Sequence, residues 1–403
     1  MKEPIEQYLS RHAEPEAADP QLLQASALAA KRTYARCLVV PAFDESENFL
    51  SCLLRNISDR QDLLVIIVVN APKNEGQTGY TPEPTQRTLK LLQTLLTPNA
   101  KHTRDCGRLI IDRVSFKGEI PHKQGVGLAR KIASDVALAL HHTGRITSPW
   151  IYQTDADACL PKDYFTTPMP KRGCAIFPHR HISDDDEVNA AARLYDLHMS
   201  YFVSALRKSG SAYAHPSLGS TLSIHAKDYA SVRGYPKRSA GEDFHILNKL
   251  SKVTPLTLLP SPSIDVQART STRVPFGTGP ALSRIIENLR QHPDGSRYLS
   301  YNYKSFALLA KGLAELGAAC QNPPRIEFSL AVGEILNELG LQKVLPLLTD
   351  TNFTQTQRQR VANEWFDALK TLRFIHLARR FNPDKSLLET IQLEAKELQL
   401  LNQ

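Results

Sequence analysis

The 403-residue chain lacks a hydrophobic run long enough to cross a membrane. Its longest unbroken apolar run, Leu63 to Val69, is far shorter than the roughly 20 residues that span a bilayer. The N-terminus opens with mixed charge and no apolar core, which does not match a secretory signal. The sequence therefore predicts a cytoplasmic protein, with peripheral membrane contact as the most that its amphipathic C-terminal region would allow.

Closely spaced cysteines are also missing. The six cysteines are scattered along the chain, and no two of them have the C-x-x-C spacing. This excludes zinc ribbons and argues against a disulfide framework. The cysteine pattern favours a reducing compartment, which agrees with the expected cytoplasmic location.

The chain has little clustering of its positive charge. The formal net charge is +8, which favours acidic partners such as nucleic acid, anionic lipid or phosphorylated small molecules. The basic residues are spread evenly, however, and the aromatic-basic interleaving of nucleic-acid-binding proteins is absent. We therefore expect a phosphorylated small-molecule ligand and no nucleic-acid partner.

Strand and helix patterns alternate after Arg36. Short apolar runs of strand length are separated by helical patterns, and this alternation predicts an α/β fold with a doubly wound, mostly parallel sheet flanked by helices. After Pro280 the pattern is helical. We expect an N-terminal extension over 1–35, a catalytic domain over 36–280 and an all-helical C-terminal appendage over 281–403. The expected strands are 37–41, 63–70, 109–114, 150–154 and 174–178, and the expected helices are 47–57, 86–96, 127–141 and 187–208.

The segment Thr154-Asp155-Ala156-Asp157 follows a predicted buried strand. Open α/β sheets bind ligands at the carboxyl ends of their strands, so both carboxylates are expected in the ligand crevice. Aspartates two residues apart on an extended segment point to the same side and suit one hard divalent cation. The alternative is an aspartate pair that caps a turn before Pro161. The position directly after a strand favours the metal site.

A second acidic segment, Gly241-Glu242-Asp243-Phe244, opens a predicted helix. Acidic residues in a first turn stabilise a helix whatever their function, which is the alternative explanation. Successive helical side chains diverge by about a quarter turn, so only one of the two faces the site. We assign the reaction to Asp243 and a supporting or acceptor-binding role to Glu242.

A third segment combines glycines and cations at a helix start, Gly125-Val-Gly127-Leu-Ala-Arg130-Lys131. A helix N-terminus with cations suits a phosphate. The segment is not a dinucleotide fingerprint, because Arg130 replaces the third glycine. An ordinary loop-to-helix junction would explain it equally well.

Together these segments resemble the family-two glycosyltransferases. Val39-Val-Pro41-Ala-Phe43-Asp-Glu45 is similar to the opening strand and loop of that family, and the segments at 125–131, 154–158 and 219–243 follow in the family's order. The resemblance covers roughly residues 36 to 250. It implies a GT-A fold, a nucleotide-diphosphate-sugar donor, Mg²⁺ or Mn²⁺, and inversion at the anomeric carbon during transfer to an acceptor hydroxyl.

The resemblance also implies roles for individual residues. Asp243 is the expected catalytic base, with Glu242 beside it. The expected metal ligands are Asp157 and Asp155. Position in the chain, and not the resemblance, adds two candidates for a further ligand: His179, which follows a predicted strand, and His245, two residues past the expected base. The expected donor-binding residues are Pro41, Phe43, Glu45, Asn70, Gly125, Arg130 and Asp155.

The sequence departs from the family in two places. Asn70-Ala71-Pro72 stands where the family commonly has an acidic segment that recognises the nucleotide base of the donor. The identity of that nucleotide base is therefore left undetermined by the sequence. The Gln-x-x-Arg-Trp segment of processive synthases is absent. The basic stretch 269–279 either takes its place as a loop over the donor diphosphate or is an ordinary linker into the helical region. Three alternatives remain: a sugar-nucleotide pyrophosphorylase, a non-catalytic sugar-nucleotide-binding module, and a scaffold role of the helical C-terminal region that could coexist with catalysis.

Overall fold

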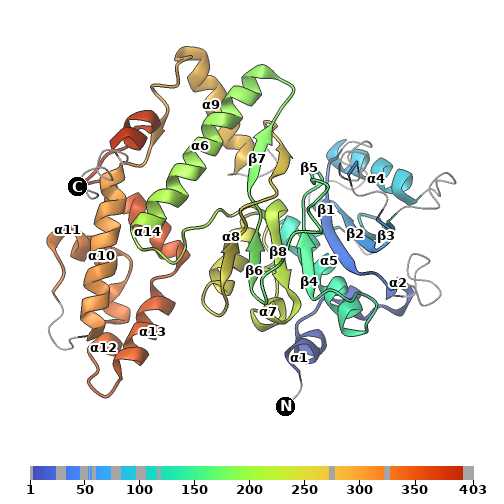
Figure 1. Ribbon diagram of the computed structural model, residues 1–403, viewed down its shortest axis with the longest axis horizontal. Helices are drawn as coiled ribbons and strands as arrows, with labels where there is room; N and C mark the ends of the chain where they lie inside the picture. Colours follow the sequence, from blue (N-terminus) through green and yellow to red (C-terminus); the bar gives the residue numbers. More distant parts are fainter. Residues whose placement is uncertain are drawn as a thin grey trace. The chain divides into compact units, whose positions relative to one another are not determined.

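The computed structural model describes residues 3–23, 33–45, 53, 55–56, 60–73, 83–96, 106–115, 119–271, 277–321 and 327–393. The chain forms two compact units (Figure 1). Unit 1 contains Met1–Ile182 and Ser217–Ala268, and unit 2 contains Ser183–Pro216 and Arg269–Gln403. From the sequence we expect a boundary at residue 280, with the helix over 187–208 in the catalytic domain. In the structure that helix belongs to unit 2 together with the C-terminal helices. Of the helix expected over 47–57, the structure describes only residues 53, 55 and 56, so this expectation stays a prediction.

Unit 1 is built on a seven-stranded sheet with the order β3-β2-β1-β4-β8-β6-β9 (Figure 1). β8 is antiparallel to the other six strands, which are all parallel to one another. The α/β class and the mostly parallel sheet expected from the sequence are therefore confirmed. The strands are β1 (Arg36–Ala42), β2 (Leu63–Asn70), β3 (Gly107–Arg113), β4 (Trp150–Gln153), β6 (Cys174–Ile176), β8 (Leu222–His225) and β9 (Leu256–Leu258).

Both faces of this sheet are buried. Alternate side chains of a strand point to opposite faces, so Val39 packs in one apolar cluster while Leu38 and Val40 pack in another. One cluster takes residues from α1 (Pro4–Arg11), α5 (Gly125–His142), α7 (Ala226–Ser231) and α8 (Glu242–Leu250), and the other takes residues from α4 (Glu83–Leu96). Two-sided burial explains why the central strands are continuously apolar.

The order of strands creates a switch point between β1 and β4. From β1 the chain moves outward through β2 to β3, and then returns to the other side of β1 to form β4. In open α/β sheets the ligand crevice lies at the carboxyl ends of the two strands where the order reverses. The loop after β1 (43–45) and the segment after β4 (154–157) both begin at this edge.

A small second sheet follows the segment after β4. It has the order β5-β10-β7, with β5 (Ala158–Cys159), β10 (Ile264–Gln267) and β7 (His179–Ile182). The backbone N–H of Gln267 donates to the Asp157 carbonyl over 2.9 Å. This sheet holds the backbone of the Asp-x-Asp segment in place.

The N-terminal residues are part of unit 1 rather than a loose extension. Ile5 and Tyr8 of α1 are buried in the cluster that covers α5 and α7. The Tyr8 hydroxyl donates to Asp135 of α5 over 2.6 Å, and Lys131 bonds both Tyr8 and Asp135 at 2.6 and 2.7 Å. Two short helical segments follow, η1 (Pro15–Ala18) and α2 (Pro20–Leu23).

Unit 2 is a helical assembly with its own apolar core. That core takes Leu206 from α6, Phe306 and Leu309 from α10, and Phe374 from α14. In the described residues beyond Pro280 the expected helical character is confirmed, apart from two strands of two residues each. None of the described helices is long and apolar enough to cross a membrane. The elements are α6 (Asp186–Lys208), α9 (Thr278–Gln291), β11 (Leu299–Ser300), α10 (Tyr303–Gln321), α11 (Leu330–Glu338), η4 (Leu341–Lys343), α12 (Leu345–Leu348), α13 (Gln355–Trp365), α14 (Ala368–Ala378) and β12 (Lys385–Ser386).

Candidate functional site

The loop after β1 has a constrained backbone. Asp44 adopts a φ of 56°, a left-handed conformation that is uncommon for a residue other than glycine. Its N–H donates to Thr88 Oγ1 over 2.9 Å, and its carboxylate accepts from Arg87 Nε over 2.6 Å. Helix α4 therefore fixes the loop that carries Phe43 and Glu45. Sequence reasoning did not single out Asp44, since nothing local signals its conformation.

Asp155 lies two residues after the switch-point strand β4 and meets Arg130 of α5. Arg130 Nη2 donates to Asp155 Oδ1 over 2.6 Å. The Arg130 side chain is 2% exposed, whereas the Asp155 side chain is 32% exposed. The pair therefore has a buried cation and a carboxylate that still reaches solvent.

Glu242 reaches the same guanidinium from α8. Arg130 Nε donates to Glu242 Oε1 over 3.2 Å, and the Glu242 side chain is buried. Gly241 precedes this helix with a φ of 71°, which lets the chain turn so that two carboxylates open α8. The strand-end and helix-start segments identified in the sequence thus meet at one arginine.

Asp243 lies in the same electrostatic environment. Burial and the neighbouring Glu242 charge raise the pKa of Asp243 to about 7, and burial also raises the pKa of Glu242. Arg130 opposes both shifts. A carboxyl group that titrates near neutral pH can exchange a proton with a substrate under ordinary conditions.

The site carries more negative than positive charge. Asp155, Glu242 and Asp243 act on one another electrostatically, and Arg130 is the cation that acts on all three. Three carboxylates around one guanidinium leave an excess of negative charge whenever they are all ionised. The site can balance this excess by holding a proton or by accepting a cation.

Thr154, Ser220 and Tyr235 each have a buried side-chain hydroxyl without a hydrogen-bond partner among the described residues. Thr154 precedes Asp155, Ser220 follows Gly219, and the Tyr235 ring lies 5.8 Å from the guanidinium carbon. Buried polar groups are nearly always paired, and exceptions gather where a site holds water or ligand atoms.

The glycines at the start of α5 have a packing role. A Cβ on Gly125 would come within 2.6 Å of Ser239 Cα, and the N–H of Gly127 donates to the Arg238 carbonyl over 2.9 Å. The loop 236–241 therefore occupies the space beside this helix start. This close approach gives Gly125 a packing role, and its contact with the donor stays a prediction.

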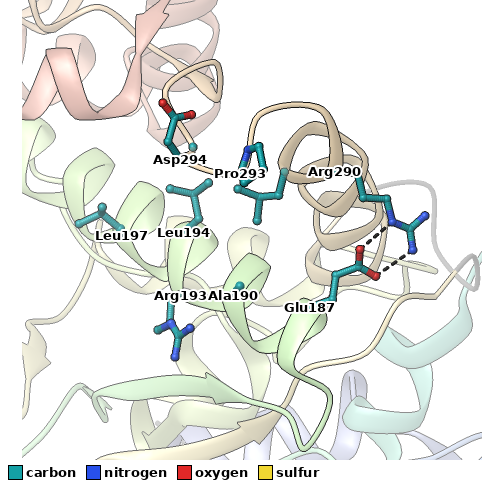
Figure 2. A pocket seen from close by; sticks show the side chains of 10 residues that line it. Glu187, Ala190, Arg193, Leu194, Leu197, Arg290, Pro293 and Asp294 are labelled. Atoms are coloured by element: carbon teal, nitrogen blue, oxygen red, sulfur yellow. Dashed lines mark hydrogen bonds and ion pairs between the residues drawn. The ribbon is translucent and has the colours of Figure 1, made fainter.

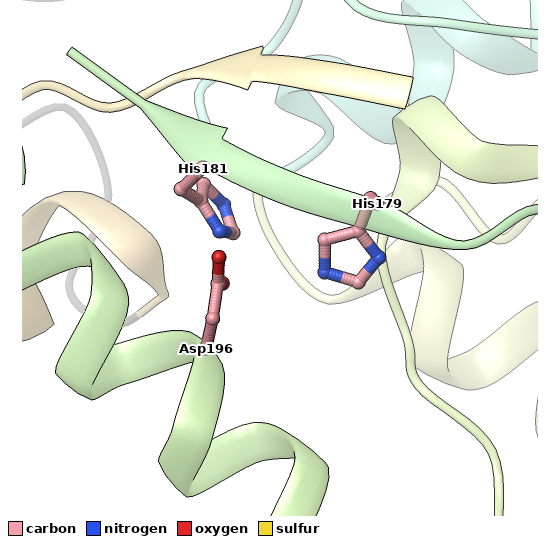
Figure 3. A group of neighbouring side chains, drawn as sticks. All are labelled: His179, His181 and Asp196. Atoms are coloured by element: carbon pink, nitrogen blue, oxygen red, sulfur yellow. The ribbon is translucent and has the colours of Figure 1, made fainter. Parts of the chain in front are cut away.

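The four residues expected to bind metal do not form a cage. Within the described part of the chain, no three of Asp155, Asp157, His179 and His245 bring ligand atoms within 4.8 Å of one another. His179 lies on β7 with its ring edge-on to that of His181, the centroids being 5.5 Å apart (Figure 3). His245 lies on α8, two residues after Asp243. Asp155 and Asp157 remain the carboxylates at the switch point.

Two further expected donor-binding residues lie at strand ends. Pro41 is in β1, and Asn70 is the buried last residue of β2, the strand next to β1. Both lie at the carboxyl edge of the parallel part of the sheet. They are therefore on the side of the sheet where the sequence analysis expected the donor.

Unit 2 contains a separate pocket of about 450 Å³ between α6 and α9 (Figure 2). Leu194, Leu197 and Leu289 give it an apolar lining. At its edge Arg290 forms a two-pronged ion pair with Glu187, at 2.6 and 2.8 Å. None of the residues expected to act in transfer lines this pocket.

Comparisons with known proteins leave the family open. No protein-family model matches the chain, and no curated protein sequence matches it. Among solved structures, the chain is similar to apo mouse xyloside xylosyltransferase 1, at 12% identity and a TM-score of 0.26. That match covers 56% of this chain and 85% of the other. At this TM-score the similarity does not establish a shared fold, so the assignment of function depends on the residues of the site.

Proposed function

We propose that this protein is a metal-dependent glycosyltransferase of the family-two type with a GT-A fold. It transfers a sugar from a nucleotide-diphosphate donor to an acceptor hydroxyl by a single displacement that inverts the anomeric carbon. The observation that carries the proposal is that Asp155 and Glu242 meet on Arg130 at the switch point of the sheet, with Asp243 next to Glu242 in the first turn of α8. Such a switch point is where open α/β sheets bind their ligands.

The residues present fit a divalent cation. Asp157 is half-buried and follows β4, and the carboxylates of Asp155, Glu242 and Asp243 add negative charge to the site when they are ionised. Magnesium sites commonly use one or two carboxylates, water and substrate phosphates rather than a complete protein cage. We assign the direct ligand to Asp157. When bound, Mg²⁺ or Mn²⁺ would supply positive charge to the donor diphosphate.

Asp155 has a different role in this proposal. Its carboxylate is held by Arg130 yet remains partly exposed. We assign it to the donor ribose or to a water molecule on the cation. On the other side of the switch point, the end of β1 and the loop after it carry Pro41, Phe43 and Glu45. We assign these three residues to donor binding as well.

Asp243 is the proposed general base. Its carboxylate takes the proton of the acceptor hydroxyl while the acceptor oxygen forms a bond to the sugar carbon. The bond from that carbon to the diphosphate oxygen breaks, and the nucleoside diphosphate departs with the bonding electrons. The pKa of about 7 supports this role, because a base works best when it titrates near the working pH.

The rival functions make different demands on these residues. A binding module has no need of a carboxyl group with a raised pKa, and perturbed titration at a ligand edge favours catalysis. A pyrophosphorylase would use a glycine-rich nucleotide loop after the first strand, where this chain has Pro41-Ala-Phe-Asp-Glu45. Glycosyl transfer accounts for both observations.

The test is the Asp243→Asn variant. A donor is first identified by screening nucleotide sugars for Mn²⁺-dependent thermal stabilisation. Asp243→Asn should keep its affinity for that donor and lose about 10²- to 10⁴-fold in kcat for transfer to a hydroxyl acceptor, because the amide cannot accept the proton. The matched control is Asp163→Asn, which changes an exposed aspartate and should transfer at the wild-type rate.

Two outcomes would contradict the proposal. Wild-type transfer by Asp243→Asn together with an inactive Glu242→Gln would exchange the roles of the two carboxylates. A wild-type protein that binds nucleotide sugars but never turns them over would establish the binding module instead.

A further inference from the structure

We propose that Arg130 is a positioning residue that sets the geometry between the donor side and the acceptor side of the site. It does so by holding Asp155, at the end of β4, and Glu242, at the start of α8, on one buried guanidinium. The inference rests on the proposed transferase function. In this inference Arg130 aligns the donor-binding residues with the acceptor-side carboxylates and does not contact the donor diphosphate.

The contacts of Arg130 connect three segments that are far apart in the sequence. Nη2 donates to Asp155 over 2.6 Å, Nε to Glu242 over 3.2 Å, and Nη1 to the Gly219 carbonyl over 3.3 Å. These segments lie 25, 112 and 89 residues from Arg130. One side chain thus links β4, the first turn of α8 and the turn before β8.

The chemistry of these contacts requires arginine. A guanidinium presents donors in a fixed planar fork, so its three contacts fix directions as well as distances. Lysine has the same charge but is a flexible point cation, and it could not hold all three partners in this geometry. Gly219 also matches the arginine, because a Cβ there would lie 2.5 Å from Arg130 Nη2.

Burial separates this role from direct ligand binding. Arg130 is 1% exposed, and its surroundings include the Tyr235 ring and two carboxylates. A cation directed at these groups is not available as a solvent-facing phosphate ligand. It can still act on the reaction, because Glu242 is followed directly by Asp243, the proposed base.

The kinetic consequence follows from the link. In the proposed mechanism Asp243 must approach an acceptor hydroxyl that faces the donor sugar. Displacing a reacting group by about 1 Å can cost about 10²-fold in rate. Without Arg130, β4 and α8 lose their shared anchor, so alignment suffers more than donor binding.

The experiment uses Arg130→Lys, with Arg172→Lys as the matched control. Arg172 forms an ion pair with the buried Asp228 carboxylate, at 2.5 Å, but its own side chain is exposed and, among the described residues, it hydrogen-bonds Asp228 and none of those assigned to transfer. We expect Arg130→Lys to lower kcat for transfer about 10²-fold while the donor KM changes less than about threefold, and Arg172→Lys to keep the wild-type kcat. Equal kcat in Arg130→Lys and wild type would overturn the inference.

A second pair of variants separates positioning from stability. Arg130→Met leaves Glu242 buried without its cation, so it should unfold at a lower temperature than wild type. In Arg130→Met/Glu242→Met both buried charges are removed, and we expect the unfolding temperature to recover while transfer stays at least 10²-fold below wild type. Recovery of transfer along with stability would show that Arg130 is structural only.

The outcome also distinguishes this inference from the proposed function. If wild-type protein neither binds nor turns over any nucleotide sugar with Mn²⁺, the transferase assignment fails and the positioning role fails with it. If wild type transfers sugar and Arg130→Lys is unaffected, the positioning role alone fails.

Discussion

Asp243 and Glu242 are adjacent in the sequence, yet the site treats them differently. Glu242 is buried and pairs with Arg130, while Asp243 is partly exposed and accepts a bond from the Phe244 N–H over 2.7 Å. The arginine stabilises the ionised form of its direct partner, Glu242. Burial of Asp243, together with the neighbouring Glu242 charge, raises the pKa of Asp243 to about 7.

The raised pKa of Asp243 predicts a pH profile. Below pH 7 the carboxyl is protonated and cannot accept a proton, so kcat/KM for transfer should rise with pH and level off above about 7. Steady-state rates from pH 5 to 9 measure it. The folded pKa exceeds the usual 3.8, so this group lowers the stability of the folded state as pH rises from about 4 to 7. A flat profile across this range would exclude Asp243 as the base.

The sequence was informative about the carboxylates and less so about Arg130. Asp155 and Asp157 could be placed at the crevice because they follow a buried strand, and Glu242 because it opens a helix. The partners of Arg130 depend on how three distant segments pack, which no local pattern records. A cation at a helix start suggested phosphate binding, and only the tertiary structure reveals its contacts with carboxylates.

At the scale of elements, α5 and the loop 236–241 form one unit of support for the site. The loop packs on the first turn of α5, where the Gly127 N–H donates to the Arg238 carbonyl. The same loop leads directly into Gly241 and the acidic start of α8. The position of α8 therefore depends on how closely this loop approaches α5.

Gly127→Ala tests this dependence. The new Cβ would lie 2.5 Å from the Pro236 carbonyl oxygen and 2.6 Å from that of Arg238, so the loop backbone must move. We expect a loss of about 1–3 kcal/mol in unfolding free energy, measured by urea denaturation. We also expect at least a tenfold lower kcat. Gly317→Ala in α10, which has open space around its Cβ, is the control. An active, fully stable Gly127→Ala would contradict the packing role.

The sequence predicted long, buried strands more readily than short strands of mixed polarity. Strands β1 and β2 have seven and eight residues and an apolar pattern that a buried parallel strand requires, and both were predicted. Strands β7, β9 and β10 have three or four residues and mixed polarity, so they carry too little periodicity to be recognised. They form through pairing with distant strands, which the sequence does not display.

At the scale of the whole molecule, the proposed ligand-binding residues belong to unit 1. Unit 2 has its own helical core and contributes none of the residues assigned to the donor or metal. Ligand binding should therefore stabilise the two units unequally. The difference can be measured without knowing the acceptor.

We predict that donor with Mn²⁺ slows amide exchange in β1 and β4 more than in α10. At a donor concentration 100 times its dissociation constant, binding stabilises the folded state by about 2.7 kcal/mol. Asp157→Asn should remove the Mn²⁺-dependent part of this protection while leaving exchange without ligand unchanged. Hydrogen exchange with mass spectrometry resolves the elements. Equal protection in Asp157→Asn and wild type would remove Asp157 as the metal ligand.

The order of the two units along the chain has a consequence during translation. The ribosome makes α6 before the return segment Ser217–Ala268, and its core residue Leu206 precedes its core neighbour Phe306 by 100 residues. At about 5–20 residues per second, roughly 5–20 s pass before that neighbour is made. During this interval the apolar side of α6 has no α10 to cover it, so the speed of synthesis determines how long a nascent chain exposes that surface to chaperones.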